Sequence, residues 1–417
     1  MRDDNRSPAT GGQAMRFGIW GKRVTLARVR RDIGGEVFAD VNIHASWRRW
    51  LPFAFGIVAI ALCIDLLHRN DPIGVDFHTY VAAGQVGLQN GWSHIYDQGL
   101  VAIEQKELSP SQIAQPFLSP PTVAFLAAPL GFLPYSVAYA VWAAFLFTVF
   151  AAALAWSGVS KGWAKWIAVA GALSPWWVMH AVNVGQVVPL EAAGLVVAWR
   201  LVRERREVLA GIALGAILFK PNNAILVPCA LLFASRFRSF ATWVGVVVIA
   251  LTVVLFTVGT GGMSEYVAQL RGPLPRGADD LTLHGALAAT GTLAAVLRIL
   301  IIGAVMAAAH RLRVSPGLVI PLAIVGSLLV SSYLHASDLC VLAAAGWMAW
   351  EERTSPAWRI PLVAFWVLGS PYLQALGLSI HLRRWPWLEL VLLLVFLMAA
   401  WWPSLTAVAD SRRRAPA

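Results

Sequence analysis

The first apolar stretch of the chain decides its structural class. Residues 51–67 read LPFAFGIVAIALCIDLL, and a short polar joint then leads to residues 74–80, which read GVDFHTY. A membrane-spanning helix needs about 17 to 25 predominantly apolar residues, so residues 51–67 predict a membrane anchor. Asp76 then follows within a few residues of the membrane exit, where the bilayer holds a carboxylate at a fixed depth.

Similar apolar runs continue along the rest of the chain. Hydrophobic residues make up 58% of the sequence, charged residues only 13%, and 20 residues are Trp. The mean hydropathy is positive. This composition lies outside the range of soluble domains and predicts an all-α integral membrane protein, a polytopic helical bundle of about twelve spans. No segment between the spans is long enough to fold as a soluble domain of its own.

The charged residues divide the chain into three parts. Residues 1–50 are rich in Arg and predict a disordered cytoplasmic arm, residues 51–407 form the transmembrane domain, and residues 408–417 form a basic cytoplasmic tail. The net charge is +11, but the basic residues sit in short joints beside apolar spans. They therefore indicate membrane topology rather than a nucleic-acid partner.

The run after Ser46 lies far from the N-terminus and has no small-residue cleavage site, so it predicts an anchor rather than a signal peptide. Cys63, Cys229 and Cys340 fall in or beside apolar spans without a pairing or metal-ligand pattern, which is typical of packing residues.

The positive-inside rule predicts which joints share a side of the membrane. The arm lies inside, so residues 70–115, which are polar and net acidic, form an external loop. Apolar residues recur in this loop at helical spacing, which predicts short amphipathic helices along the membrane surface. Alternation then places four further polar segments on the same outer face: Asn183–Gln186, Lys220–Asn223, Gly261–Gly285 and Tyr333–Asp338.

Two groups of basic residues conflict with this predicted topology. Lys161 and Lys165 prefer the inside, whereas two full spans between residues 121 and 156 would carry them outside. A short or re-entrant segment beginning at Pro120 and Pro121 would repair the count. Arg383 and Arg384 also fall outside, which the rule tolerates because it is a bias summed over loops.

Asp76 is the strongest candidate for chemistry. A carboxylate at the membrane boundary can take a proton from a substrate that arrives through lipid, and His78 and Tyr80 follow as candidate substrate-binding residues. The alternative is structural, because Asp is a good helix N-cap.

Lys220 heads the candidates in the later segments. Pro221 follows Lys220 and interrupts the apolar run. The Lys220 ammonium would pair with a phosphate as a compact point charge, although a lysine side chain that extends to the membrane interface explains its position equally. His335 beside Asp338 would bind phosphate or orient an acceptor. The remaining candidates of the outer segments are Gln186, Asn222, Arg271, Arg276 and His284.

Asp65 and Glu191 lie inside predicted spans, where a carboxylate marks either a pathway or a structural hydrogen bond. The outer acids form no recognisable ligand set, so we predict no metal. The chain has no Walker loop, dinucleotide-binding glycine fingerprint, metalloprotease helix or nucleophile elbow. Its sequence thus argues against ATP-driven pumping and hydrolase chemistry, and we predict no cofactor.

Taken in order, these motifs resemble glycosyltransferase family 87. The resemblance rests on the segment Asp76–Tyr80, the proline-rich run from Pro116 to Pro134, Gly185 with Gln186, Lys220 with Pro221, and the segment Ser331–Leu339. The family comprises polyprenol-phosphate-mannose-dependent mannosyltransferases with the GT-C fold.

The resemblance implies an enzyme whose active site faces outward, in bacteria toward the periplasm from the inner membrane. It implies a polyprenyl-phosphate sugar as donor, a glycolipid or glycan as acceptor, and Asp76 as the general base. The acceptor hydroxyl would attack the anomeric carbon with inversion, giving an α-linked sugar. One base suffices because phosphate is already a good leaving group, so the paired acid of glycosidases is not needed.

Two rival functions stay open at this point. A transporter or flippase of lipid-linked sugars also needs about twelve spans and intramembrane charge, but it predicts inverted repeats that the chain does not show. An oligosaccharyltransferase-like ligase of the same architecture predicts a large outer soluble domain, which the sequence lacks.

Overall fold

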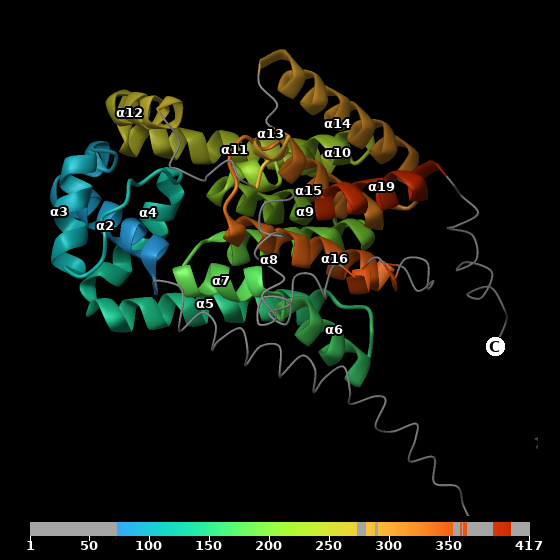
Figure 1. The fold of residues 1–417 in the computed structure, drawn as a ribbon, viewed down its shortest axis with the longest axis horizontal. Helices are drawn as coiled ribbons and strands as arrows, with labels where there is room; N and C mark the ends of the chain where they lie inside the picture. Colours follow the sequence, from blue (N-terminus) through green and yellow to red (C-terminus); the bar gives the residue numbers. More distant parts are fainter. Residues whose placement is uncertain are drawn as a thin grey trace, which may run out of the picture. The chain divides into compact units, whose positions relative to one another are not determined.

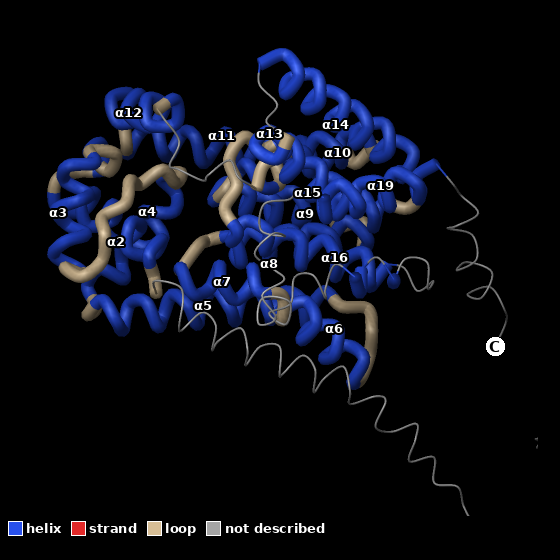
Figure 2. Tube along the Cα trace, viewed as in Figure 1, coloured by secondary structure: helices blue, strands red, loops and turns tan. Residues whose placement is uncertain are grey.

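The computed structural model describes six stretches of the chain: residues 73–272, 281–287, 291–352, 359–360, 362–364 and 387–401. These residues form helices and loops, without a strand (Figure 2). They belong to one compact unit, residues 49–417. The predicted arm, the first span with Asp65 and the C-terminal tail lie outside the described residues, as do Arg276, Arg383 and Arg384.

The described helices follow one another with short joints (Figure 1). In chain order they are α2 (Val75–Gln89), η2 (Trp92–His94), α3 (Gln98–Leu108), α4 (Pro121–Ala127), η3 (Ala128–Phe132), α5 (Tyr135–Ser157), α6 (Trp163–Leu173), α7 (Trp176–Val184), α8 (Val188–Arg203), α9 (Glu207–Ala213), η4 (Leu214–Phe219), η5 (Pro221–Asn223), α10 (Leu226–Phe233), α11 (Phe237–Thr257), α12 (Gly259–Arg271), α13 (Leu283–Ala286), α14 (Gly291–Arg311), η6 (Leu312–Val314), η7 (Pro316–Leu318), α15 (Val319–Val330), η8 (Ala336–Leu339), α16 (Cys340–Glu352) and α19 (Trp387–Trp401).

Three of the described helices are long and apolar enough to cross a membrane: Tyr135–Ser157, Phe237–Thr257 and Gly291–Val314. The pair α6 and α7 makes a fourth if the two helices count as one bent span. The other apolar helices are shorter than the length that a straight span needs. The all-helical, membrane-capable architecture agrees with the sequence, whereas the count of about twelve spans stays a prediction.

Proline explains the bend between α6 and α7. The two helices meet at 63°, and Pro175 lies at the break with φ −58° and ψ 140°. Proline has no backbone N–H to continue the hydrogen-bond ladder of α6, and Pro175 itself is extended, so α6 ends and α7 starts in a new direction. This break directs α7 toward η8, against which it packs.

The segment after Pro120 is short, as the topology of Lys161 and Lys165 required. α4 and η3 together span only Pro121–Phe132 before Leu133 returns to an extended conformation. A twelve-residue helix rises about 18 Å, well under the roughly 30 Å of the hydrocarbon core.

The first predicted loop differs from expectation in one helix. α3 buries only Val101 and Gln105, one turn apart, as an amphipathic surface helix does. α2 is instead buried continuously from Phe77 to Gly87. The reason is that α3, α4 and η3 all pack on α2 (Figure 1), so it lies inside a small core of its own and has no free polar face.

Trp142 on α5 ties this small core to the rest of the bundle. Its side chain is 2% exposed, its ring centroid lies 5.5 Å from that of Phe77, and its Nε1–H donates to the Gly185 carbonyl oxygen at 2.7 Å.

Trp142→Ala is expected to lower the free energy of unfolding by about 3–5 kcal/mol, because it leaves a cavity and an unpaired carbonyl. Reversible unfolding in mixed detergent micelles measures this. Trp156→Ala, on the same helix but 51% exposed, is the matched control and should change the free energy by only about 0.5 kcal/mol. Equal effects of the two substitutions would refute the role given to Trp142.

Candidate active site

Asp76 lies in the first turn of α2, but it does not cap the helix. Gly74 occupies the N-cap position with φ 69°, and no side chain caps the first turn. The Asp76 carboxylate instead accepts a hydrogen bond from Gln186 Nε2 at 2.9 Å. The N-cap alternative is therefore wrong, and the carboxylate is held at the positive end of the helix dipole by a residue 110 positions away.

The hydrogen-bond partners of Gln186 determine the orientation of its side-chain amide. Its Oε1 accepts hydrogen bonds from the Tyr80 hydroxyl and from the Val187 backbone N–H, the latter at 3.2 Å. Two donors on Oε1 leave Nε2 to face Asp76, as a carboxylate requires. Burial raises the pKa of Tyr80 well above its usual range, so the phenol stays protonated and keeps this role. Tyr80, Gln186 and Asp76 form one hydrogen-bonded unit, which we call the acid cluster.

Gly185 brings Gln186 to α2. It has φ 76°, a left-handed conformation that glycine adopts without a steric penalty, and it ends α7. A Cβ on Gly185 would lie 2.5 Å from the Cβ of Phe77, so only glycine allows this close approach. The backbone N–H of Gly74 donates to the Asn183 carbonyl at 2.8 Å and closes the same contact. The predicted break at Asn183–Gln186 is thus the docking point of α7 on α2.

Burial raises the pKa of the Asp76 carboxyl above 3.8, and nearby Lys220, His335 and His180 partly counteract this. Among the described residues, no cation lies within 4.0 Å of the carboxylate. A carboxylate with a raised pKa and no ion-pair partner is a stronger proton acceptor than an exposed one.

A second polar group surrounds Lys220. Its Nζ lies 2.6 Å from Asp338 Oδ1, and the carboxylate of Asp338 is fully buried. Asn223 Nδ2 donates to the same oxygen at 3.2 Å and to Glu191 Oε2 at 3.1 Å. We call these four residues the lysine cluster. Glu191 therefore makes a structural hydrogen bond, which was one of the two roles predicted for it from the sequence.

The residues around His335 join the lysine cluster. The His335 backbone N–H donates to Asp338 Oδ2 at 2.8 Å, and its ring Nε2 bonds to the Tyr333 hydroxyl. Asn222 Nδ2 donates to the Tyr333 carbonyl at 3.1 Å. Burial and the Lys220 charge lower the pKa of His335, so the ring is neutral at pH 7.

The sequence predicted that residues 183–186, 220–223 and 333–338 share one face with Asp76. The structure brings these segments together through the two clusters, and Asp76 lies within electrostatic range of Lys220, His335 and Asp338. Which side of the membrane this group faces stays a prediction.

Three other predicted residues lie apart from both clusters. His78 donates from Nε2 to the Gln105 carbonyl at 2.6 Å, and burial lowers its pKa, which fits a neutral packing residue between α2 and α3. Arg271 is exposed at the end of α12, and His284 lies half-buried in α13. In the described part of the chain, no hydrogen bond or ion pair joins them to Asp76 or Lys220.

The sequence interpretation missed His180. It lies on α7, stacks on Trp176 with ring centroids 4.6 Å apart, and acts electrostatically on Asp76. The available signal was an ionisable residue inside an apolar run. The sequence interpretation included Asn223 and Tyr333 only as parts of motifs. Contacts made through the backbone, or by a side chain that bridges two others, cannot be predicted from the residue type alone. For metals, the described residues contain no group of three or more His, Cys, Asp or Glu that fits an ion.

The sequence model of glycosyltransferase family 87 matches residues 117–332, just over half of the chain. The chain belongs to glycosyltransferase family 87. It is therefore a membrane glycosyltransferase, and the rival transporter interpretation has no support from this match. No curated protein and no solved structure matches the chain.

The family 87 match contains only part of the two clusters. Gln186, Glu191, Lys220 and Asn223 lie inside it, whereas Asp76 precedes it and Asp338 follows it. The tertiary contacts from Gln186 to Asp76 and from Lys220 to Asp338 bring these outer residues to the matched part.

Replacing Gln186 by Leu removes the hydrogen bond that stabilises the charged form of Asp76, so its pKa should rise further. Deprotonation then needs a higher pH, and the acidic limb of the rate–pH profile of sugar transfer should move to higher pH, with a lower rate at pH 7. The measurement is transfer rate from pH 4 to 9 in both proteins. An unshifted limb in a folded variant contradicts the link between Gln186 and Asp76.

Proposed function

We propose that this glycosyltransferase moves a sugar, mannose by family resemblance, from a polyprenyl phosphate to a hydroxyl of a glycolipid or glycan. Asp76 is the general base, and the reaction inverts the anomeric carbon. The site faces outward, toward the periplasm if the membrane is a bacterial inner membrane. The protein's own residues supply the catalytic groups.

One observation carries this proposal. Gln186 orients the Asp76 carboxylate, and burial raises the pKa of that carboxyl. No cation among the described residues lies at ion-pair distance from it. Lys220 and two histidines nevertheless lie within electrostatic range. A free base near the Lys220 ammonium suits a reaction in which an acceptor loses a proton while an anion departs.

The step balances with one base. Asp76 takes the proton of the acceptor hydroxyl as its oxygen forms a bond to the anomeric carbon. The bond from that carbon to the phosphate oxygen breaks on the opposite face, and the polyprenyl phosphate leaves with the electron pair. Because the leaving group is an anion of low basicity, no general acid has to protonate it.

Lys220 and His335 are the residues we assign to the departing phosphate. Lys220 is paired with Asp338 at 2.6 Å, so Asp338 fixes its position and a phosphate oxygen would share its remaining N–H donors. Asn222 and the neutral ring of His335 add hydrogen-bonding groups from neighbouring segments. Arg271, the last residue of α12, and Arg276 remain alternative phosphate ligands.

The test is sugar transfer by the purified protein in nanodiscs, supplied with radiolabelled polyprenyl-phosphate mannose and a membrane lipid extract as acceptor. Asp76→Asn keeps the shape of the side chain and an acceptor oxygen for Gln186 but removes the base. We expect it to lower the transfer rate by about 100-fold or more.

Asp97→Asn is the matched control. Asp97 caps α3 by accepting from the backbone N–H groups of Gly99 and Leu100, and Asn caps a helix as well as Asp does. Its transfer rate should stay within about twofold of wild type. Undiminished transfer in Asp76→Asn would refute Asp76 as the base. Transfer only from a different polyprenyl-phosphate sugar would correct the donor sugar, and transfer only from a nucleotide sugar would refute the lipid donor.

A further inference from the structure

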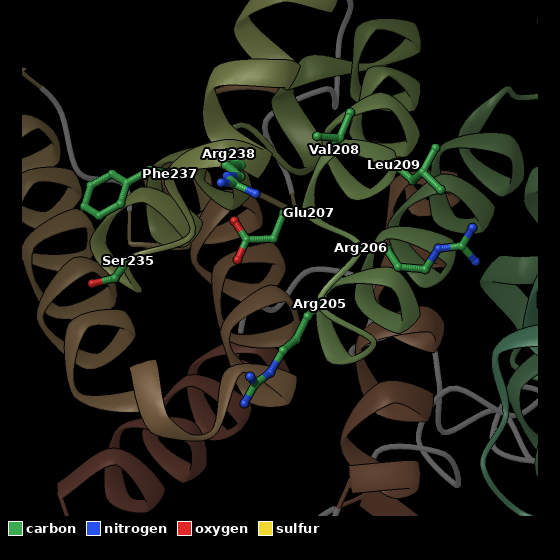
Figure 3. Close-up of a pocket in the computed structure, with 8 residues that line it drawn as sticks. All are labelled: Arg205, Arg206, Glu207, Val208, Leu209, Ser235, Phe237 and Arg238. Atoms are coloured by element: carbon green, nitrogen blue, oxygen red, sulfur yellow. The ribbon is translucent and has the colours of Figure 1, made fainter.

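A basic cavity lies at the far end of α8 from the acid cluster. It has a volume of about 590 Å³ and forms where the turn between α8 and α9 meets the turn between α10 and α11 (Figure 3). Its lining residues are Arg205, Arg206, Glu207, Val208, Leu209, Ser235, Phe237 and Arg238. The 16 residues of α8 rise about 24 Å, so the cavity is separate from the Asp76 site.

The two turns have the same backbone geometry. Arg205 and Ser235 both adopt a left-handed conformation, with φ 60° and 62°. In each turn the next residue donates its N–H five positions back, from Arg206 to Leu201 and from Arg236 to Leu231. This is the hydrogen-bond pattern of a Schellman helix end, and α9 and α11 pack on each other directly after it. The matching geometry presents side chains of both turns to one cavity.

The acidic residues nearby are already paired with other arginines. Glu207 lies 3.3 Å from Arg236, and Glu204 lies 2.6 Å from Arg200. In Figure 3 Arg206 extends away from Arg205, and its guanidinium is 4.0 Å from Glu204.

In the part of the chain that the structure describes, neither Arg205 nor Arg238 has a carboxylate within ion-pair distance. The cavity therefore presents two guanidinium groups without a counter-ion.

Three of the remaining lining residues are apolar and exposed. Val208 is 52%, Leu209 41% and Phe237 62% exposed. Phe237 begins α11, a membrane-capable helix in which only Ser239 and Val254 are buried in the protein. The exposed apolar face of α11 thus runs directly from the basic cavity, which matches a ligand with a charged head and an apolar tail.

We propose that this cavity binds an anionic phospholipid. The phosphate sits against Arg205 and Arg238, because guanidinium groups form bidentate hydrogen bonds with phosphate oxygens, and the acyl chains lie along α11. The positive-inside rule predicts that these two Arg-containing turns lie on the cytoplasmic side, the side of the membrane to which such headgroups attract basic groups. The ligand is a membrane component bound apart from the reacting sugar, so the proposal does not depend on the donor or on Asp76.

The test is native mass spectrometry of the purified full chain in a neutral detergent, titrated with short-chain phosphatidylglycerol. Wild type should bind it more tightly than phosphatidylcholine of the same chain length. Removing an arginine should weaken binding about fivefold, and the double variant Arg205→Gln with Arg238→Gln about 30-fold. The matched control, Arg311→Gln with Arg313→Gln, removes the same charge from another basic joint and should bind as wild type does.

A thermal unfolding midpoint for each variant verifies that it is folded. Unchanged phosphatidylglycerol binding in the Arg205 and Arg238 variant, or an equal loss in the control, would overturn the proposal. Displacement of the lipid by millimolar inorganic phosphate would also overturn it, because it would identify a site for a free anion rather than for a lipid.

Discussion

The ion pair between Lys220 and Asp338 is the interaction on which the interior of this protein depends. It joins Lys220, at the break after η4, to Asp338 in the short helix η8, and Asp338 is fully buried. Removing two charges from water costs several kcal/mol per ion, so such a pair persists only when further hydrogen bonds support it. Asn223 and the His335 backbone provide that support, and both come from the same interrupted segments.

Interrupted helices explain why polar chemistry gathers in an apolar bundle. Each break frees backbone groups that must find partners inside the protein, because lipid offers none. Pro175, Gly185 and Pro221 create three such breaks. At the second, the Trp142 indole N–H donates to the Gly185 carbonyl and the Tyr139 hydroxyl donates to the Asn183 carbonyl. Gln186 directly follows the Gly185 break, so the contact that closes this break also places a hydrogen-bond donor beside the Asp76 carboxylate.

The two ends of α8 have different chemistry. Its N-terminal end follows Gln186, which orients the Asp76 carboxylate, and its C-terminal end leads to Arg205, which has no carboxylate at ion-pair distance among the described residues. A base needs a site that is partly dehydrated, whereas a headgroup-binding arginine needs access to the bilayer surface. The length of one helix keeps these two environments apart.

The sequence by itself determined the helical membrane class and the family, and it singled out Asp76, Gln186, Lys220 and Asp338 as candidate site residues. The length of an apolar run, a proline that interrupts it and a charged residue within or beside it are local properties, so they can be recognised from the residue types. Only the tertiary structure decided that Asp76 accepts from Gln186 instead of capping its helix, that α2 is buried, that His78 packs on α3, and that His180 acts on Asp76. These outcomes depend on which segments meet in space, and residues more than 100 positions apart carry no pairing information in a single chain.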